Sequence, residues 1–337
     1  MKDKFDQVMD RFLVPMERFR GPVVDSTYFL RHDGSFVFAE GYCHPPRALW
    51  GMIIKYPRDG GHIDVFGRAY DWTHREYVDG ELVIVPFERQ VENQFRVAPA
   101  LREIQGEKPP YARTFVKFPL SDFRGYFDGV RSLRLLREDY PWIDSAVVQT
   151  CELLDYDPDR AGVSGSLAYG RVEDDVDLVI VADPEEIYRI GAAIRKYKAG
   201  HPQARVVELG KEWPVRFHYA GTLICPFFRY ADPARQAPLF DCRMSLLEDG
   251  VSIEGTVADD FHGYYLPAIL GLEGVRRPDT GEALENMELI IYHGAMRGEL
   301  RTGDRVRTRA QLVEVSAPGR PARRAVLVTD TDVEIRD

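Results

Sequence analysis

The chain has 337 residues, of which 45% are hydrophobic and 29% charged, and its formal net charge at pH 7 is -10. This composition is typical of a globular protein with two or three domains. It excludes membrane-spanning helices, because apolar runs such as 178–182 are far shorter than the roughly 20 residues needed, and the negative charge gives the whole chain no general attraction to nucleic acid.

Residues 1–110 are predicted to form a β-rich domain with a leading amphipathic helix. The helix is expected because five apolar side chains recur with helical spacing: Phe5, Val8, Met9, Phe12 and Leu13. Charged residues interrupt this segment, so it does not resemble a signal peptide. Runs of β-branched and aromatic residues at 26–42 and 80–88 are bounded by turn pairs such as Asp33-Gly34, which is typical of strands. The Gly-Glu-Lys-Pro-Pro stretch at 106–110 is the predicted boundary.

Residues 111–235 alternate between helical and strand patterns. One helix is predicted to end before Asp157-Pro158, and a second spans 183–200, with Asp183 as its cap and Pro184 as its first residue. Strands are expected at 161–164, 175–182 and 205–209, followed by a hairpin of 215–219 with 222–230. The alternation predicts a central core in which helices cover a mixed sheet.

Residues 236–337 show no long helical period. Their β-branched runs are separated by Gly, Pro and Asp, which suggests a small β-barrel, such as the oligonucleotide-binding type. The expected fold class is therefore α+β or α/β. A central core is flanked by the N-terminal β-rich domain and this C-terminal barrel.

The stretch at 162–182, GVSGSLAYGRVEDDVDLVIVA, places acidic residues between a Gly-Ser turn and an apolar strand. Residues two apart in a strand point the same way, so Asp175 and Asp177 should present both carboxylates on one face. Two such charges about 4 Å apart repel by roughly 4 kcal/mol at an effective dielectric of about 20. The pair therefore favours a bound cation, and its oxygen ligands suit Mg²⁺ that also binds substrate phosphates.

This stretch resembles the signature of the DNA polymerase beta-type nucleotidyltransferase superfamily. The matching parts are Gly165-Ser166, a spacer of eight residues, Asp175-Val176-Asp177 and an apolar strand. The three-part layout resembles predicted nucleotidyltransferases with additional β-rich segments at both ends. The resemblance implies a polymerase-beta-like core, an NTP substrate, and Mg²⁺ or Mn²⁺ held by Asp175 and Asp177. It also implies that Gly165, Ser166 and nearby amides hold the nucleotide phosphates. A short helix is expected at 167–171, and its N-terminal amides should face the phosphates. Arg171 is a further candidate phosphate contact.

The superfamily also requires a third carboxylate on a neighbouring strand. Glu208 is the candidate, because its strand is the next one after the helix at 183–200. The resemblance implies that Glu208 shares a second Mg²⁺, which lowers the pKa of the acceptor hydroxyl for in-line attack on the α-phosphorus. The other candidate neighbour, 222–228, contains no acid. If that strand lies beside Asp175, the triad is incomplete.

A basic segment near the C-terminus suggests the acceptor. Arg305, Arg307 and Arg309 alternate with small or apolar residues, so a strand there has one basic face. We expect this face to contact nucleic-acid phosphates, and the predicted acceptor is an RNA end. A solvated face without a ligand is the alternative. Two alternative functions stay open. One is transfer to a protein or small-molecule hydroxyl, and the other is nucleotide or RNA binding without catalysis.

The cysteine pattern indicates neither a zinc ribbon nor a disulfide-linked partner. The four cysteines lie far apart and form no C-x-x-C pair: Cys43, Cys151, Cys225 and Cys242. Buried free thiols in a reducing, cytoplasmic environment are the expectation.

Overall fold

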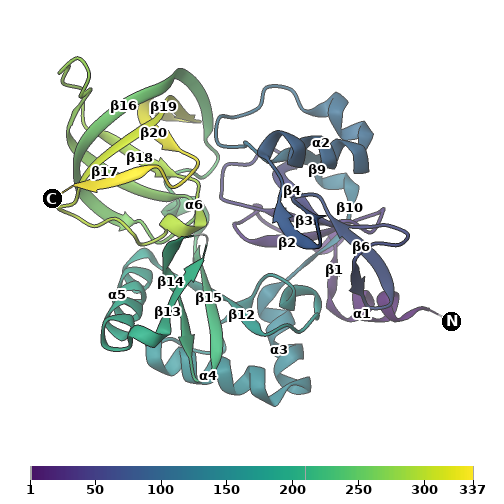
Figure 1. The fold of residues 1–337 in the computed structure, drawn as a ribbon. Coiled ribbons are helices and arrows are strands. Elements are labelled where there is room, and N and C mark those ends of the chain that lie inside the picture. The colour runs from purple at the N-terminus through teal and green to yellow at the C-terminus, as the bar shows by residue number, and fades with distance from the viewer. Residues whose placement is uncertain (1, 209, 337) are drawn as a thin grey trace. The chain divides into compact units, whose positions relative to one another are not determined.

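The structure is a computed structural model and describes residues 2–208 and 210–336 (Figure 1). The chain divides into two compact units. The first contains the chain up to Lys108, together with Ala112–Asp144 and Ala161–Asp177. The second contains Pro109–Tyr111, Ser145–Arg160 and the chain from Leu178 onward.

The first unit is built on an eight-stranded sheet. Its strands are β1 (Leu13–Pro15), β2 (Thr27–Arg31), β3 (Phe36–Ala39), β4 (Ala48–Pro57), β5 (Ile63–Val65), β6 (Arg68–Trp72), β9 (Val116–Pro119) and β10 (Phe123–Phe127). They follow the order β1-β10-β2-β3-β4-β6-β5, and β9 also pairs with β4. A separate hairpin joins β7 (Arg75–Val78) to β8 (Glu81–Ile84). Phe29 and Phe118 are completely buried in the core of the large sheet.

The helices of the first unit include the predicted amphipathic helix. They are α1 (Lys4–Phe12), α2 (Phe87–Val97) and α3 (Gly129–Asp139), with 3-10 turns η1 (Met16–Arg18), η2 (Pro99–Ile104), η3 (Leu120–Asp122) and η4 (Leu167–Tyr169). The Asp3 side chain caps α1 by accepting the backbone N–H of Asp6. Phe5, Met9 and Phe12 are buried, so α1 packs by the apolar face that its spacing predicts.

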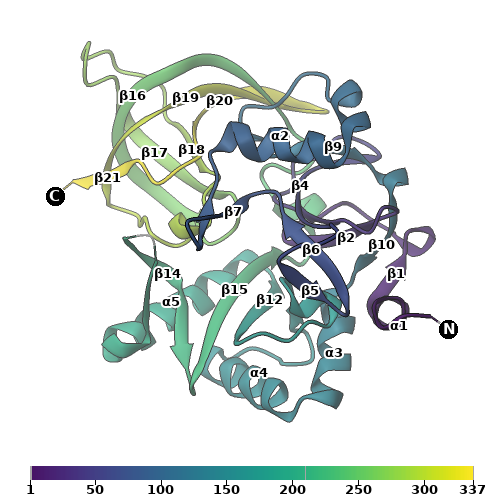
Figure 2. The ribbon, with the colours of Figure 1, turned by 45° about the vertical axis from the view of Figure 1, so that its right-hand side comes forward.

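The most deeply buried side chains of helix α2 are polar, and Val91 and Phe95 are only partly buried against the core. Figure 2 shows α2 alongside β4, and the amide oxygen of Gln94 accepts the backbone N–H of Ile53 on β4 at 2.9 Å. Asn93 donates to the carbonyl of Thr73, and Gln90 donates to that of Val85, each at 2.8 Å. These bonds compensate the desolvation of the three amides.

A five-stranded sheet follows the order β11-β12-β15-β14-β13. Its strands are β11 (Gly162–Val163), β12 (Asp175–Ala182), β13 (Arg205–Glu208), β14 (Lys211–Tyr219) and β15 (Thr222–Tyr230). The accompanying helices are α4 (Pro141–Leu154), α5 (Pro184–Gly200), the 3-10 turn η5 (Pro202–Ala204) and α6 (Pro233–Gln236). All five strands were expected near these positions, although Leu209, the last residue of one predicted strand, lies outside the described residues.

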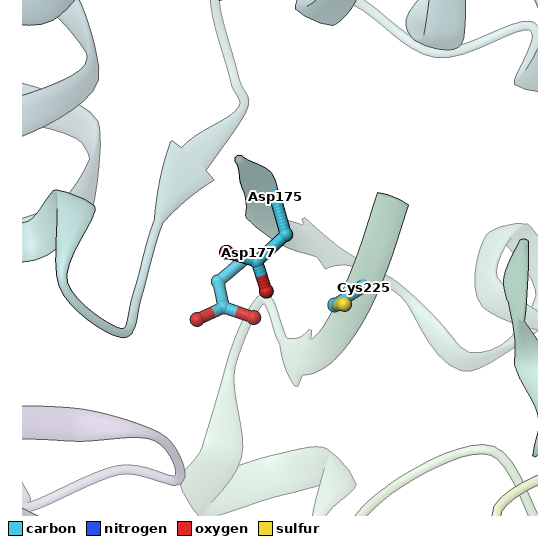
Figure 3. A group of neighbouring side chains, drawn as sticks. All are labelled: Asp175, Asp177 and Cys225. Carbon is cyan, nitrogen blue, oxygen red and sulfur yellow. The ribbon is translucent and has the colours of Figure 1, made fainter. Parts of the chain in front are cut away.

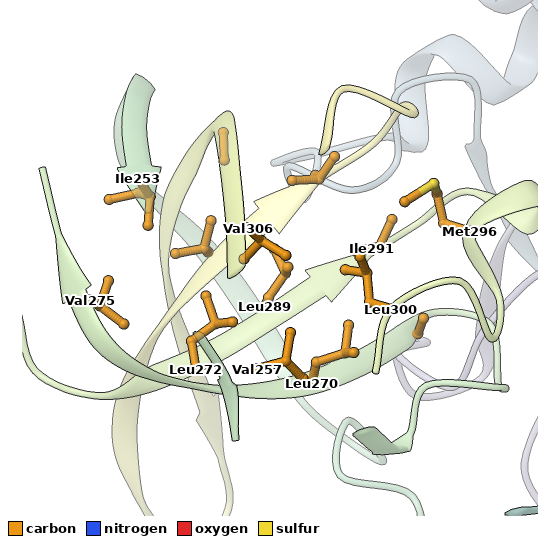
Figure 4. Close-up of a cluster of buried hydrophobic side chains, with 14 of the residues drawn as sticks. Ile253, Val257, Leu270, Leu272, Val275, Leu289, Ile291, Met296, Leu300 and Val306 are labelled. Atoms are coloured by element: carbon orange, nitrogen blue, oxygen red, sulfur yellow. The ribbon is translucent and has the colours of Figure 1, made fainter. Parts of the chain in front are cut away.

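The C-terminal sheet is bent into a half-barrel around an aliphatic core (Figure 4). Its strands are β16 (Arg243–His262), β17 (Ala268–Arg276), β18 (Met287–Ile291), β19 (Arg305–Ala317), β20 (Arg320–Val328) and β21 (Val333–Arg336), with the 3-10 turn η6 (Gly294–Met296). The order is β16-β17-β18-β20-β19-β21, and β16 also pairs with β19. Ile253, Leu289 and Ile291 are fully buried in this core.

The predicted fold class is wrong. The chain is strand-rich, with 42% strand and 26% helix distributed over several sheets, and the described residues show no central helix-rich α/β core. After α5, the chain folds back through β13, β14 and β15 as antiparallel neighbours, so these strands need no crossover helices. The expected C-terminal barrel is likewise corrected to a half-barrel.

Candidate functional site

The Gly-Ser turn lies directly against the start of β12. The backbone N–H of Ser164 donates to the carbonyl of Asp177 at 2.9 Å, and the Ser164 hydroxyl donates to the carbonyl of Ser26 at 2.8 Å. Gly165 adopts a φ of 58°, and a Cβ atom at this position would overlap Oδ2 of Asp177. Glycine is therefore needed both for the left-handed backbone and for the close approach of the carboxylate.

The segment after this turn is shorter than the helix predicted at 167–171. η4 is a single 3-10 turn, and Gly170 ends it in the left-handed conformation. The amide of Ala168 donates to the carbonyl of Ser164, and that of Arg171 donates to the carbonyl of Ser166. Because these amides bond within the turn and one turn has little dipole, the segment does not offer the expected helix N-terminus to a phosphate.

Asp175 and Asp177 project from the same face of β12. Both are half-buried, whereas Val176 between them and Leu178 after them are fully buried. Cys225 extends from the adjacent strand β15, and ligand atoms of the three side chains lie within 4.8 Å of one another (Figure 3). Two carboxylates and a thiol are thus close enough to bind one metal ion.

The strand order separates Glu208 from the aspartate pair. We expected its strand to lie beside β12, but β15 and β14 lie between β12 and β13, so that topological expectation is wrong. Glu208 instead forms an ion pair with Arg216 of β14, and Nε of Arg216 donates to Sγ of Cys225 at 3.1 Å. The role of Glu208 as third carboxylate stays a prediction. Cys225, rather than Glu208, lies next to Asp175 and Asp177.

Two basic side chains of the first unit, Arg171 and Lys55, interact with residues that follow the Gly-Ser turn. Arg171 forms an ion pair with Glu173 at 3.2 Å. Lys55 of β4 is buried, and its Nζ donates to the hydroxyl of Tyr169 at 2.8 Å. Burial, reinforced by the Arg171 charge, lowers the pKa of Lys55 to about 8. Lys55 contacts Tyr169 of the segment that follows the Gly-Ser turn.

Aromatic hydroxyls near the site are held in their neutral form. Burial, followed by the influence of Tyr169 and of the Asp177 charge, raises the pKa of Tyr28 well above its usual range. Burial also raises the pKa of Tyr169. Both phenols therefore act as uncharged hydrogen-bonding groups at neutral pH.

Sequence reasoning missed Lys55 and Cys225. A lysine inside the apolar run of β4 is a usable signal, because a buried amine needs a specific partner. Cys225 gives no such signal, since a cysteine inside an apolar strand is usually a buried core residue. Its significance depends on strand order, which the sequence pattern does not contain.

The three arginines proposed to contact nucleic acid alternate on β19 as expected. Arg305 and Arg309 are exposed and Arg307 is half-buried, while Val306, Thr308 and Ala310 are buried. Arg307 lies opposite Glu254 on β16 and Glu334 on β21, whereas Arg305 lies opposite Arg336. Within the described residues, none of the three forms an ion pair at 4.0 Å or less. The three arginines therefore lie on one face of β19, although nearby acids partly offset the positive charge of this face.

The four cysteines are buried, and none of them forms a disulfide within the described residues. Among the described residues, every helix is too short or too polar to cross a membrane. No protein-family model, curated protein or solved structure matches this chain.

Proposed function

We propose that the chain is a divalent-metal-dependent nucleotidyltransferase, which transfers a nucleoside monophosphate from an NTP to an acceptor hydroxyl. The observation that carries the proposal is the pair of carboxylates at the start of β12, with Gly165 directly against Asp177. The sequence motif supplies the reaction class. The proposal concerns this site and its chemistry, and the polymerase-beta type of core forms no part of it.

The donor set fits a hard divalent cation. Asp175 and Asp177 are suitable ligands for Mg²⁺ or Mn²⁺, which usually binds one or two carboxylates together with substrate phosphates. Such a metal, when bound, offsets phosphate charge and makes the α-phosphorus more electrophilic. Gly165 leaves room for the carboxylate, while the hydroxyl of Ser166 and the guanidinium of Arg171 would contact the nucleotide phosphates.

We propose RNA as the acceptor. The support is the alternation of Arg305, Arg307 and Arg309 with buried residues on β19, which gives an acidic chain a local basic strand. Transfer to a protein or small-molecule hydroxyl would leave the metal site unchanged and make this face irrelevant. Incubation of the protein with a labelled NTP and RNA, or with no added acceptor, distinguishes RNA transfer from self-modification.

Metal and nucleotide binding provide the first test. We expect Mn²⁺ together with an NTP to raise the melting temperature of the wild type, because ligands that bind only the folded state stabilise it. Asp177→Asn should remove most of this increase. Asp174→Asn is the matched control, since Asp174 is exposed and lies just outside the pair. The proposal would be contradicted if the melting temperature of the wild type did not change on addition of the metal together with any NTP.

A non-catalytic metal site is the second candidate, favoured by Cys225 next to the aspartates. Thiolate sulfur suits Zn²⁺ better than Mg²⁺. In that case Zn²⁺ should stabilise the protein without an NTP, and no label should be transferred. Stabilisation by Mg²⁺ or Mn²⁺ only in the presence of NTP would favour the nucleotidyltransferase instead.

A further inference from the structure

A charged pocket of about 500 Å³ lies in the second unit, away from any residue used above. Helix α5 contributes Arg195 and Lys198, and the hairpin region of β13 and β14 contributes Arg205 and Glu212. The segment after η6 adds Glu299 and Arg301. The lining therefore contains four cationic side chains and two carboxylates, so an anion is its electrostatically favoured ligand.

Three of the four cations already have protein partners. Lys198 pairs with Glu212 at 2.9 Å and also donates to the carbonyls of Trp213 and Pro214. Arg205 lies 3.9 Å from the same glutamate. These groups are held in place by the protein, which keeps the wall of the pocket ordered.

Arg301 is fixed in a different way. Its Nη1 lies 3.2 Å from the buried carboxylate of Asp260, and its Nη2 donates to the carbonyl of Gly298 at 2.5 Å. Its guanidinium also lies over the ring of Tyr264, 4.8 Å from the centroid. Arg301 is therefore already ion-paired with Asp260.

Arg195 differs from these three residues. Its Nη1 is buried and has no hydrogen-bond acceptor among the described residues. Its guanidinium lies over the ring of Tyr264, 5.5 Å from the ring centroid, and this contact supplies attraction but no hydrogen-bond acceptor. Burial and then the nearby Arg301 charge lower the pKa of Arg195, and the charge of Asp260 offsets part of this effect. A buried guanidinium donor without an acceptor is costly.

We propose that this pocket binds a phosphate group, with Arg195 as its principal ligand and Arg205 as a second contact at the rim. A phosphate offers several strong acceptors to guanidinium donors, and the guanidinium of Arg195, which lines the pocket, forms no hydrogen bond or ion pair among the described residues. The volume exceeds that of one phosphate and falls within the range of small-molecule sites. The phosphate therefore belongs to a larger molecule, either a phosphorylated metabolite or a nucleic-acid strand.

Titration with inorganic phosphate at constant ionic strength tests the site. We expect saturable heat release in calorimetry for the wild type, and Arg195→Gln should weaken binding by about tenfold, as expected for loss of a charge-assisted hydrogen bond. Arg195→Lys should restore part of the affinity. Arg205→Ala, at a side chain that is 47% exposed, should weaken binding with little risk to folding.

The matched control is Arg189→Gln, on the same helix. Arg189 pairs with Asp155 and does not line the pocket, so this variant should bind phosphate like the wild type. This inference does not rest on the proposed nucleotidyl transfer. No saturable phosphate binding by the wild type, or equal binding by wild type, Arg195→Gln and Arg205→Ala, would overturn the proposal.

Competition identifies the molecule that carries the phosphate. A single-stranded RNA oligonucleotide without terminal phosphates should displace inorganic phosphate if the site takes a nucleic-acid backbone. A nucleoside monophosphate that displaces it when the oligonucleotide does not would assign the site to small phosphorylated molecules. Either displacement supports the phosphate site.

Discussion

Gly165 shows how one residue controls the position of a carboxylate. We predict that Gly165→Ala destabilises the protein and weakens Mn²⁺ binding, because the new methyl group overlaps Oδ2 of Asp177 and the φ of 58° is unfavourable for alanine. The left-handed backbone alone costs about 1–2 kcal/mol. The overlap adds to this cost and moves the metal ligand. Urea unfolding and titration with Mn²⁺ measure the two effects.

Gly221→Ala is the control for backbone strain. Gly221 has a φ of 82° in the hairpin between β14 and β15, and nothing lies within 4 Å of the added methyl group. This variant should lose stability through strain alone and keep its Mn²⁺ affinity. If Gly165→Ala behaves identically, the close contact with Asp177 has no functional consequence.

Lys55 should make stability depend on pH at the alkaline end. Its pKa is about 8 in the folded state and 10.5 in the unfolded state. Below pH 8 the Lys55 amine is therefore protonated in both states and adds no pH dependence to the free energy of unfolding. Between about pH 8 and 10.5 the unfolded state binds the proton more tightly. The Lys55 contribution to the free energy of unfolding therefore rises with pH, by about 3 kcal/mol across the window.

Comparison with Lys55→Met isolates this contribution from other titrating groups. We expect the stability of the wild type to increase relative to the variant as the pH rises from 8 to 10, as measured by urea unfolding at each pH. Below pH 8 the difference between the two proteins should be constant. A constant difference across the whole range would show that the folded and unfolded states hold the Lys55 proton equally.

At the scale of elements, strand order determines which side chain accompanies the aspartates. Because β15 lies next to β12 and β13 lies at the sheet edge, we predict that Cys225 contributes to metal binding. Cd²⁺ should produce a thiolate absorption band in the wild type that Cys225→Ala abolishes. Glu208→Gln should retain the band, since Glu208 pairs with Arg216. A band that survives in Cys225→Ala would assign the thiolate to another cysteine.

The elements also show where sequence patterns succeed. Helix α5 begins at Pro184 and ends at Gly200, as the predicted first residue, period and stop signal indicate, but Asp183 occupies the N-cap position without a side-chain capping hydrogen bond. The strand β12 is found over the predicted residues 175–182. Both depend on local signals, which act through neighbours in sequence.

Helix α2 shows where the same patterns fail. Its most deeply buried side chains are Gln90, Asn93 and Gln94, whereas its apolar residues Val91 and Phe95 are only partly buried against the core, so polar and apolar residues share its packed face. Its stability depends on hydrogen bonds to backbone groups of β4 and two loops, and only the tertiary structure brings those groups together. The place of Cys225 beside Asp175 and the unpartnered Arg195 are non-local in the same sense.

At the scale of the whole molecule, charge is distributed unevenly. The chain carries a net charge of -10, yet the outward face of β19 presents three arginines in succession. Global charge therefore opposes nucleic-acid binding while one strand favours it. Binding by such a protein should depend strongly on that strand and on salt concentration.

We predict that Arg305→Ala/Arg307→Ala/Arg309→Ala weakens RNA binding and flattens its dependence on salt. Each phosphate contact contributes about 0.7 to the slope of log affinity against log salt for a single strand, so the triple variant should lose up to about 2 units of slope. Arg307 should contribute least, because Glu254 and Glu334 lie opposite it. NTP binding should not change, and fluorescence anisotropy at several salt concentrations measures the slope.

A second triple variant controls for the change in net charge. Arg11→Ala/Arg102→Ala/Arg189→Ala also removes three positive charges, but from arginines that are paired with Asp139, Glu92 and Asp155. If global charge governs RNA binding, both triple variants should weaken it equally. If the β19 face makes the contacts, only its own variant should lower the salt slope. Equal RNA binding by the wild type and the β19 variant would remove RNA as the acceptor and favour a protein or small-molecule hydroxyl.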